Sequence, residues 1–326
     1  MNAFNMAVRM LSLGILIAIA GHAAAQQAYP NKPIRLIVPY PPGGSNNVLA
    51  RLVGQKLTET MGQPVAVDNR PGGNTVIGSE AMVKSPPDGY TLMLTSITHV
   101  INPNLYPDVP YDAVKDFATV CTVASTEEVL VVHPSLPANN LQEFIALAKS
   151  KPGQLNYSSS GGGNLNHLAA AMFGIMTGVT MQHIPYKGGA PALTDIIAGQ
   201  VQLGFQVPVN VIPHIKSGRV RALAITGATR LASLPQVPTF AEAGLPDFEA
   251  KVWFGIFAPA GTPKVIIDKL STEIGRILAL PDIKEKLAGQ GLEPFISTPD
   301  EFAALVKADL ARYAQVIKTA NIKAER

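Results

Sequence analysis

The chain has 326 residues, of which 47% are hydrophobic and 15% are charged, and its formal net charge is +3. This length and composition suit one large or two medium globular domains with enough apolar material for a core. The basic residues stand singly, without a run or a stripe, so we expect no nucleic-acid partner.

The first 25 residues have the pattern of a secretory signal peptide. Arg9 supplies a positive charge, residues 11–20 form a short apolar stretch, and residues 23–25 are three alanines. We expect cleavage after Ala25, and a soluble protein in the periplasm, because no later segment has about 18 uninterrupted apolar residues. The only cysteine, Cys121, lies far from the cleavage site, so neither an intrachain disulfide nor a lipid anchor is expected.

The stretch at residues 34–51 predicts a buried strand, a glycine turn and the start of a helix. An apolar run at residues 34–38 is followed by prolines, by Gly43 and Gly44, and by a Ser-Asn-Asn sequence at residues 45–47. The first N–H groups of a helix lack acceptors within the chain and lie at the positive end of the helix dipole, so an anion is the natural occupant. The turn contains no basic residue, so dipoles would hold that anion.

Strands and helices continue to alternate up to about residue 120. We expect strands at residues 65–67 and 90–95, and a second glycine loop at residues 72–74 that precedes a helix at residues 77–84. Repeated strand–helix units predict a mainly parallel sheet with its ligand edge at the C-terminal ends of the strands.

Two β-rich runs mark the places where the chain would cross between two domains. The first surrounds a polar group at residues 125–128, and the second lies at residues 248–258. Crossings near residues 120–126 and 248–255 would form a hinge about which a cleft closes on its ligand.

A second strand–glycine–helix stretch lies between these crossings, at residues 155–168. Its turn reads SSSGGGN at residues 158–164 and repeats the pattern of the first turn with more hydroxyl groups. Further along, we expect a strand at residues 201–205 that ends at Gln206, and closing helices with a capping box at Thr298.

The sequence contains none of the usual catalytic motifs, such as G-x-S-x-G, H-E-x-x-H, C-x-x-C or G-x-x-x-x-G-K. The glycines at residues 161–163 are followed by Asn166 where a dinucleotide loop needs its third glycine. No histidine has a partner at metal-ligand spacing, and only His99 and His167 lie close enough to the loops to support a ligand contact. We therefore expect no cofactor and no metal.

Many short motifs resemble one known family, in a single register from Tyr29 to the C-terminus. They are PNKPIRLIVPYPPGGSNN, VDNRPGG, PPDGYTL, INPNLY, PYDAVKDF, LNYSSSGGGN, HIPYKGGAPALTD, PHIKSGRVRALA, WFGIFAPAGTPK and TPDEFAAL. In these motifs the chain resembles the Bug-type extracytoplasmic solute receptors of the tripartite tricarboxylate transporter family.

The resemblance implies an α/β, type II periplasmic binding protein fold, in which two domains close like a venus flytrap and each is a mainly parallel sheet flanked by helices. Domain 1 would comprise residues 26–124 plus 252–326, and domain 2 residues 125–251. The resemblance further implies a monomeric, non-enzymatic receptor that captures a small organic carboxylate and delivers it to membrane permease subunits.

The resemblance also implies which residues bind the ligand. The family's two loops fall on residues 43–45 and 159–161, while residues 187–188 and 205–210 complete the wall. The expected ligand-binding residues are Tyr40, Pro42, Gly43, Gly44, Ser45, Asn47, Ser96, His99, Ser159, Ser160, Gly161, Asn164, Lys187, Gly188, Gln206 and Asn210.

Three positions depart from the family pattern. Asn47 stands where aspartate is usual, Gln206 where a Phe-Asp pair is common, and Asn164-Leu165 where a Thr-Ser pair is common. Because neutral amides suit oxygen groups better than an ammonium ion, we expect a ligand without a cationic amine, such as a di- or hydroxycarboxylate or an aromatic acid. The acids that could reach the cleft are Glu127 and Asp195.

Two other functions stay open at this point. A periplasmic hydrolase would use Ser159 or Ser160 of the 158–160 loop as nucleophile and His99 or His167 as base, although nothing in the sequence orients that base. A sensor partner of a membrane kinase would use the same fold, and the sequence does not separate that function from transport.

Overall fold

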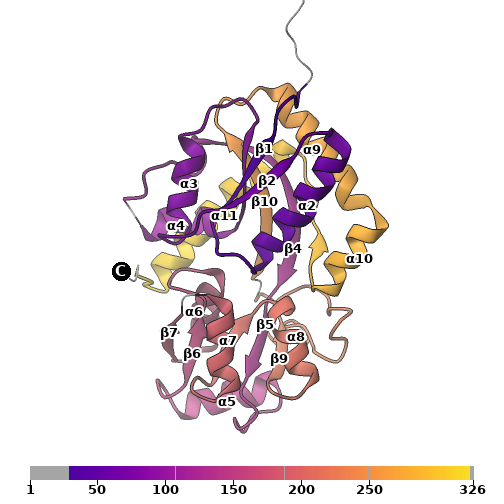
Figure 1. Ribbon diagram of the computed structural model, residues 1–326. Coiled ribbons are helices and arrows are strands. Elements are labelled where there is room, and N and C mark those ends of the chain that lie inside the picture. The colour runs from indigo at the N-terminus through magenta and orange to yellow at the C-terminus, as the bar shows by residue number, and fades with distance from the viewer. Residues whose placement is uncertain (1–28, 107, 187, 249, 324–326) are drawn as a thin grey trace, which may run out of the picture.

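Two β-sheets organise the chain, and each carries its own helices (Figure 1). The structure is a computed structural model that describes residues 29–106, 108–186, 188–248 and 250–323. The predicted signal peptide and Lys187 lie outside the described residues. Within the described part, no helix has the length and apolar character needed to cross a membrane.

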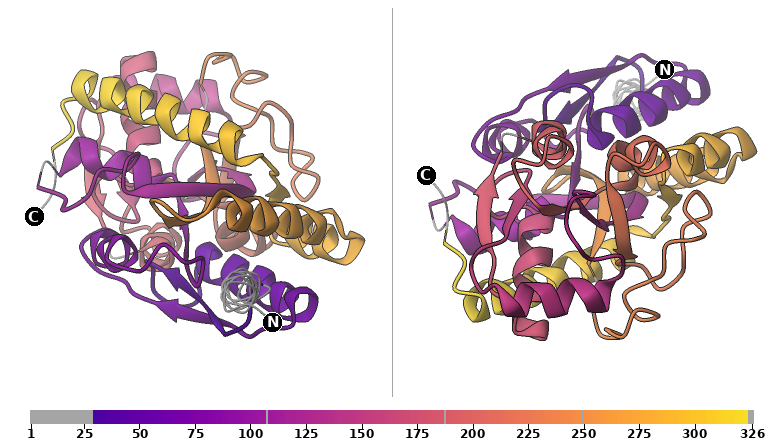
Figure 2. Two further views of the ribbon diagram at one scale, coloured as in Figure 1. Left: turned by 90° about the horizontal axis from the view of Figure 1, so that it is seen from above. Right: turned by 90° about the horizontal axis from the view of Figure 1, so that it is seen from below.

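The first lobe comprises the elements around a six-stranded sheet with the strand order β11-β4-β10-β3-β1-β2. Its strands are β1 (Ile34–Val38), β2 (Val65–Asn69), β3 (Thr91–Ser96), β4 (Phe117–Glu127), β10 (Lys251–Pro259) and β11 (Glu293–Pro294). Its helices are α2 (Ser45–Met61), α3 (Val76–Val83), α4 (Thr98–Leu105), α9 (Lys264–Ala279), α10 (Pro281–Gly289) and α11 (Pro299–Thr319). Helices cover both faces of this sheet, with α11 and α2 on opposite sides of strands β4 and β10 (Figure 2).

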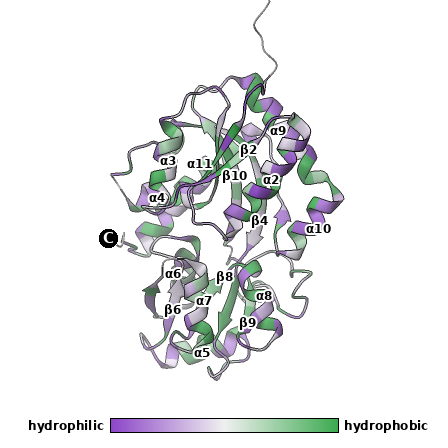
Figure 3. Ribbon diagram, in the orientation of Figure 1, coloured by the Kyte–Doolittle hydropathy of each residue, from purple (hydrophilic) through white to green (hydrophobic). Residues whose placement is uncertain are grey.

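The second lobe comprises the elements around a five-stranded sheet with the strand order β7-β6-β8-β5-β9. Its strands are β5 (Val129–Val132), β6 (Asn156–Ser159), β7 (Gln182–Pro185), β8 (Leu203–Gln206) and β9 (Arg221–Ile225). Its helices are α5 (Leu141–Ser150), α6 (Leu165–Thr177), α7 (Gly189–Ile197) and α8 (Pro208–Lys216). Hydrophobic residues follow β8 and β9 of this lobe (Figure 3), and a cluster of phenylalanines fills its core, with the rings of Phe240 and Phe248 4.3 Å apart.

The two-lobed α/β fold is confirmed, but the expectation that each sheet is mainly parallel is wrong. In the first sheet β1 is parallel to β2 and β3, whereas β10 is antiparallel to β3 and β4, and β11 to β4. In the second, β6 is parallel to β7 and β8, whereas β5 is antiparallel to β8 and β9. The first sheet is mixed because the chain leaves the lobe along β4 and returns beside it along β10, so these neighbours run in opposite directions.

The crossing strands β4 and β10 pair along their length, from Phe117 with Pro259 to Glu127 with Lys251. They lead from the first sheet to the junction of the lobes (Figure 1).

Local helix signals agree with the structure: the Thr298 hydroxyl accepts a hydrogen bond from the Glu301 N–H at 3.2 Å, which confirms the capping box.

Candidate functional site

A cavity of about 740 Å³ lies between the two lobes. Its walls are the loops that follow β1, β3 and β6, the start of α7, and the end of β8 with the first turn of α8. The C-terminal ends of these strands meet at the cavity, which is the edge where open α/β sheets bind their ligands.

Most of the expected ligand-binding residues line this cavity. They are Tyr40, Pro42, Gly43, Gly44, Ser45, Ser96, Ser160, Gly161, Asn164, Gly188, Gln206 and Asn210. The structure brings these residues together from both lobes, and it places Asn47, His99 and Ser159 behind the cavity wall.

The first glycine turn presents a bare helix start to the cavity. Helix α2 begins at Ser45 with Gly44 as its N-cap, and no side chain caps it. Gly43 has φ 96°, in the left-handed region that favours glycine. A Cβ at Gly43 or Gly44 would meet nothing within 4 Å, so the turn is open. Its N–H groups can therefore be approached closely by an anion.

Asn47 supports this turn instead of facing a ligand. Its Oδ1 accepts hydrogen bonds from the Gly43 N–H at 3.4 Å and from Arg51 Nε at 3.2 Å, and its Nδ2 donates to Asn69 Oδ1 at 2.9 Å. The side chain is buried by these contacts. The expectation that Asn47 binds ligand is therefore not supported, because its amide is used within the first lobe.

The second glycine turn faces the same cavity from the other lobe. Helix α6 begins at Leu165 with Asn164 as its N-cap, again without a side-chain cap. Asn166 Oδ1 accepts hydrogen bonds from the Ser160 N–H at 3.3 Å and from Ser160 Oγ at 3.2 Å, which folds the turn. Two uncapped helix N-termini thus point at one cavity from opposite lobes.

Ser159 lies below this turn and is fully buried. Its Oγ donates to the Gly161 carbonyl at 3.0 Å and hydrogen-bonds His183 Nε2 at 2.6 Å. His167 stacks on His183 with ring centres 3.7 Å apart, and its Nδ1 accepts from the Gly163 N–H. These histidines hold the turn in shape, and the nucleophile–base pairs that a hydrolase would need from His99 or His167 are not formed.

His99 was expected at the ligand, but the structure buries it completely in the first lobe. Its ring packs against Phe117 and Phe257, and its Nε2 hydrogen-bonds the Ala113 carbonyl at 2.9 Å. Burial lowers the pKa of His99 to about 4, so the ring is neutral at physiological pH. It stabilises the core behind β3 and does not reach the cavity.

A chain of hydroxyl groups links the two lobes across one side of the cavity. Tyr40 hydrogen-bonds Ser96 Oγ at 2.7 Å, Ser96 Oγ lies 3.4 Å from Thr98 Oγ1, and Thr98 Oγ1 lies 3.4 Å from Asn164 Oδ1. The last contact joins the first lobe to the second. These polar groups give the wall between the two glycine turns donors and acceptors for a ligand.

Sequence reasoning missed several polar residues that line the cavity. They are Asn46, Asn74, Thr75, Thr98, Tyr106, Asn166, Tyr186 and Glu128. Tyr186 precedes the expected Lys187-Gly188 pair, and its hydroxyl donates to Asp195 Oδ2 at 2.6 Å. Burial, followed by this contact with Asp195, raises the pKa of Tyr186 to about 12, so the phenol stays protonated.

Glu128 is the acidic residue among the described lining residues, and its side chain is only 3% exposed. Burial, with a smaller contribution from Glu127, raises the pKa of Glu128 to about 8. The premise that the cleft lacks an acid apart from Glu127 and Asp195 is therefore wrong. Those two do not line the cavity: Glu127 faces Lys251 Nζ at 3.8 Å, and Asp195 binds Tyr186.

Among the residues that the structure describes, no lysine, arginine or histidine lines the cavity, and no cluster of side chains could hold a metal ion. Lys187, which stands between the lining residues Tyr186 and Gly188 in the sequence, lies outside the described residues.

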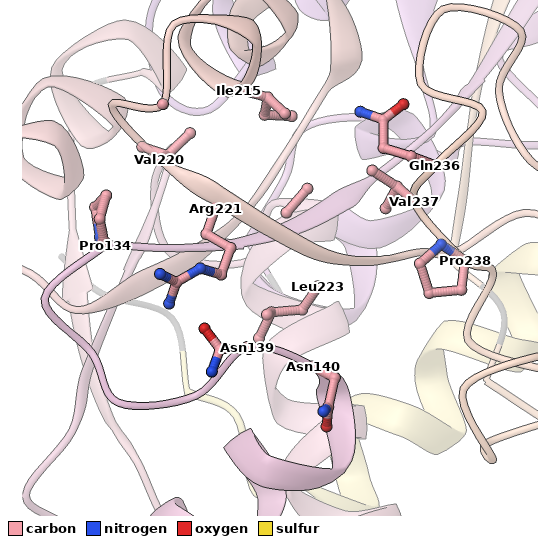
Figure 4. A pocket seen from close by; sticks show the side chains of 12 residues that line it. Pro134, Asn139, Asn140, Ile215, Val220, Arg221, Leu223, Gln236, Val237 and Pro238 are labelled. Carbon is pink, nitrogen blue, oxygen red and sulfur yellow. The ribbon is translucent and has the colours of Figure 1, made fainter.

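A second hollow of about 420 Å³ lies in the second lobe, away from the glycine turns (Figure 4). Its one charged side chain among the described residues is Arg221, whose Nη1 donates to the carbonyls of Leu136 at 3.2 Å and Ala138 at 2.9 Å. The guanidinium is thus used to hold a loop, and we assign the ligand site to the cavity between the lobes.

Comparison with known proteins agrees with this geometry. The model of a family described as "Tripartite tricarboxylate transporter family receptor" matches residues 49–322. Protein BugT of Bordetella pertussis is 39% identical over 323 residues, which cover 98% of this chain and 99% of BugT.

Two similar solved structures contain a ligand. Rpa4515 of R. palustris with adipate has a TM-score of 0.85 and 36% identity, and the match covers 91% of this chain and 100% of that one. MatC of Rhodopseudomonas palustris with bound malate has a TM-score of 0.80 and 29% identity, with 89% and 100% of the chains covered.

Proposed function

Because the chain belongs to the tripartite tricarboxylate transporter receptor family, we propose that it binds one small organic carboxylate between its lobes and delivers it to the membrane subunits of such a transporter. The observation that carries this proposal is the pair of uncapped helix N-termini at Ser45 and Leu165, which face one cavity from the two lobes. Adipate and malate in the two similar structures support the choice of a carboxylate.

The ligand contacts are the expected residues that line the cavity, with the two glycine turns holding the carboxylate. The mature protein begins near Gln26 and works in the periplasm after removal of the leader peptide. It binds without chemical turnover, since Ser159, whose Oγ hydrogen-bonds His183 Nε2 at 2.6 Å, is buried outside the cavity lining, and Ser160 makes its hydrogen bonds within its own turn.

Titration calorimetry against a panel of organic acids, followed by product analysis, tests this proposal. Gly44→Ala is the informative variant, because its backbone has an ordinary φ and its new methyl group would stand in open space above the start of α2. We expect at least about tenfold weaker binding, because the methyl group keeps an anion from the helix N–H groups.

Gly289→Ala is the matched control, since its Cβ also meets nothing within 4 Å but lies at the end of α10. Both variants should keep the wild-type melting temperature. Steady conversion of a bound acid, or equal affinities of the two variants, would contradict the proposal.

A further inference from the structure

Glu128 occupies the one position between β4 and β5, where the chain passes from the first lobe to the second. Its backbone is held firmly: the N–H donates to Thr226 Oγ1 at 2.9 Å, and the carbonyl accepts from the Thr226 N–H at 2.9 Å. Its side chain lines the cavity between the lobes. The backbone of Glu128 is therefore fixed at the junction about which the lobes would move.

Three residues that line the cavity have a buried side-chain atom without a hydrogen-bond partner among the described residues: Asn46 Oδ1 at the first glycine turn, and Glu128 Oε2 and Gln206 Nε2. Gln206 lines the same cavity and is 1% exposed. Because Val129 pairs with Gln206 in the register of β5 and β8, Glu128 and Gln206 lie at the same end of neighbouring strands. Buried polar groups are normally paired, so this end of the cavity lacks the group that would satisfy them.

Burial, with a smaller contribution from a neighbouring charge, raises the pKa of Glu128 and favours its acid form near neutral pH. From β4, Glu127 adds negative charge, although Lys251 Nζ on β10 lies 3.8 Å from the Glu127 carboxylate. From the side of α7, Tyr186 donates to Asp195. No positive side chain among the described residues lines the cavity. A protonated carboxyl group donates one hydrogen bond and accepts others.

We propose that Glu128 is a specificity-determining residue that, as a neutral acid, donates a hydrogen bond to a second carboxylate of a ligand whose first carboxylate lies at the glycine turns. This inference rests on the proposed function, because it assumes that a first carboxylate lies at those turns. Hydrogen bonds to an ionised carboxylate are stronger than neutral ones, so the Glu128 donor favours a dicarboxylate over the monocarboxylate of equal length. The dicarboxylate binds only while Glu128 keeps its proton.

Titration calorimetry with two sets of acids tests the inference: succinate, butyrate and 4-aminobutyrate, and the longer adipate, hexanoate and 6-aminohexanoate. The wild-type protein should bind one of the two dicarboxylates at least about tenfold more tightly than its monocarboxylate. The affinity of the wild-type protein for this dicarboxylate should fall about tenfold between about pH 7 and about pH 9, because Glu128 loses its proton there while the diacids stay fully ionised.

Three variants complete the experiment. Glu128→Gln keeps a donor and no longer titrates, so it should bind the dicarboxylate within about threefold of wild type near pH 7 and lose the pH dependence. Glu128→Ala should lose the preference for the dicarboxylate. Glu127→Gln is the matched control, one residue away and outside the cavity. It should retain the preference, and its affinity should still fall with rising pH, but from a lower pH, because the Glu127 charge adds a smaller part to the raised pKa of Glu128. Melting curves establish that each variant is folded.

The outcomes separate the two proposals. If no acid of either length binds to the wild-type protein, both the proposed function and this inference are wrong. If acids bind but Glu128→Ala keeps the wild-type preference and pH profile, only the inference is overturned. Tightest binding of an amino acid, with affinity that rises above about pH 8 and is lost in Glu128→Gln, would instead make Glu128 the partner of an ammonium ion.

Discussion

Burial of Glu128 opposes its ionisation, and this affects stability separately from ligand binding. The pKa of Glu128 rises from 4.5 to about 8 in the folded protein, so between these pH values the native state keeps a proton that the unfolded state releases. Its contribution to stability is fully present below pH 4.5 and is lost as the pH rises through about 8. Glu128→Gln should therefore be more stable than wild type near pH 8, by about 1–3 kcal/mol, and equally stable near pH 4.5.

Urea denaturation of the unliganded protein across this pH range measures the difference. Glu127→Gln is the control, because that side chain faces Lys251 and lies outside the cavity; it should keep most of the wild-type pH dependence, since burial is the larger cause of the raised pKa of Glu128. Stability curves of wild type and Glu128→Gln that run parallel from acid to neutral pH would show that Glu128 ionises normally in the folded state.

At the scale of single residues, the sequence located the site better than it identified the side chains in it. Clusters of glycine, serine and asparagine after apolar runs mark turns, so both glycine turns could be predicted from composition and order. Which side chain of a turn faces the ligand depends on backbone direction, so Ser160 lines the cavity while its neighbour Ser159 is buried against His183. Glu128 was missed because only folding brings the crossing between β4 and β5 to the glycine turns.

At the scale of elements, the local pattern predicted strands and helices but not how strands pair. The apolar runs that became β1 and β3 were found because their period and flanking turns are local properties. The antiparallel partners of β10 are distant in sequence, since β4 and β10 are separated by the whole second lobe. The expectation of mainly parallel sheets failed for that reason.

Gly255 on β10 tests how closely α11 packs on the first sheet. A Cβ at Gly255 would overlap Phe302 Cζ and lie 2.7 Å from Phe302 Cε1, and the Phe302 ring is fully buried. Gly255→Ala should therefore destabilise the protein by about 1–3 kcal/mol in urea denaturation, because the core must shift to admit a methyl group.

The double variant Gly255→Ala/Phe302→Leu should lose less stability than the sum of the losses in the two single variants, because the smaller side chain relieves the overlap. Gly275→Ala on α9 is the matched control, since its Cβ meets only Ile296 Cγ2 at 3.6 Å, an ordinary contact. Equal stabilities of the Gly255→Ala and Gly275→Ala variants would show that the sheet yields freely at this point.

At the scale of the whole molecule, the two crossings were predicted because apolar β-rich runs at residues 119–132 and 248–258 interrupt the strand–helix alternation. The structure places β4, β5 and β10 there. That the lobes enclose a cavity was implied only by the resemblance, because no local signal places two distant turns face to face. The exact domain limits and the hinge stay predictions.

The lobes should close further when a dicarboxylate binds. They already touch at one side, where Thr98 Oγ1 lies 3.4 Å from Asn164 Oδ1 and a Cβ at Gly163 would overlap Leu105 Cδ1. The cavity of about 740 Å³ is much larger than a four- or six-carbon acid, so a ligand that contacts both glycine turns favours a narrower cavity by its differential affinity.

Small-angle X-ray scattering with and without saturating adipate or succinate, whichever binds in calorimetry, measures this closure. We expect a smaller radius of gyration with ligand for the wild-type protein and for Gly289→Ala. The Gly44→Ala variant should show no change at the same ligand concentration, because its first glycine turn no longer holds the carboxylate. Identical profiles for the saturated and free wild-type protein would mean that the lobes are rigid about β4 and β10, and that water fills the space around the ligand.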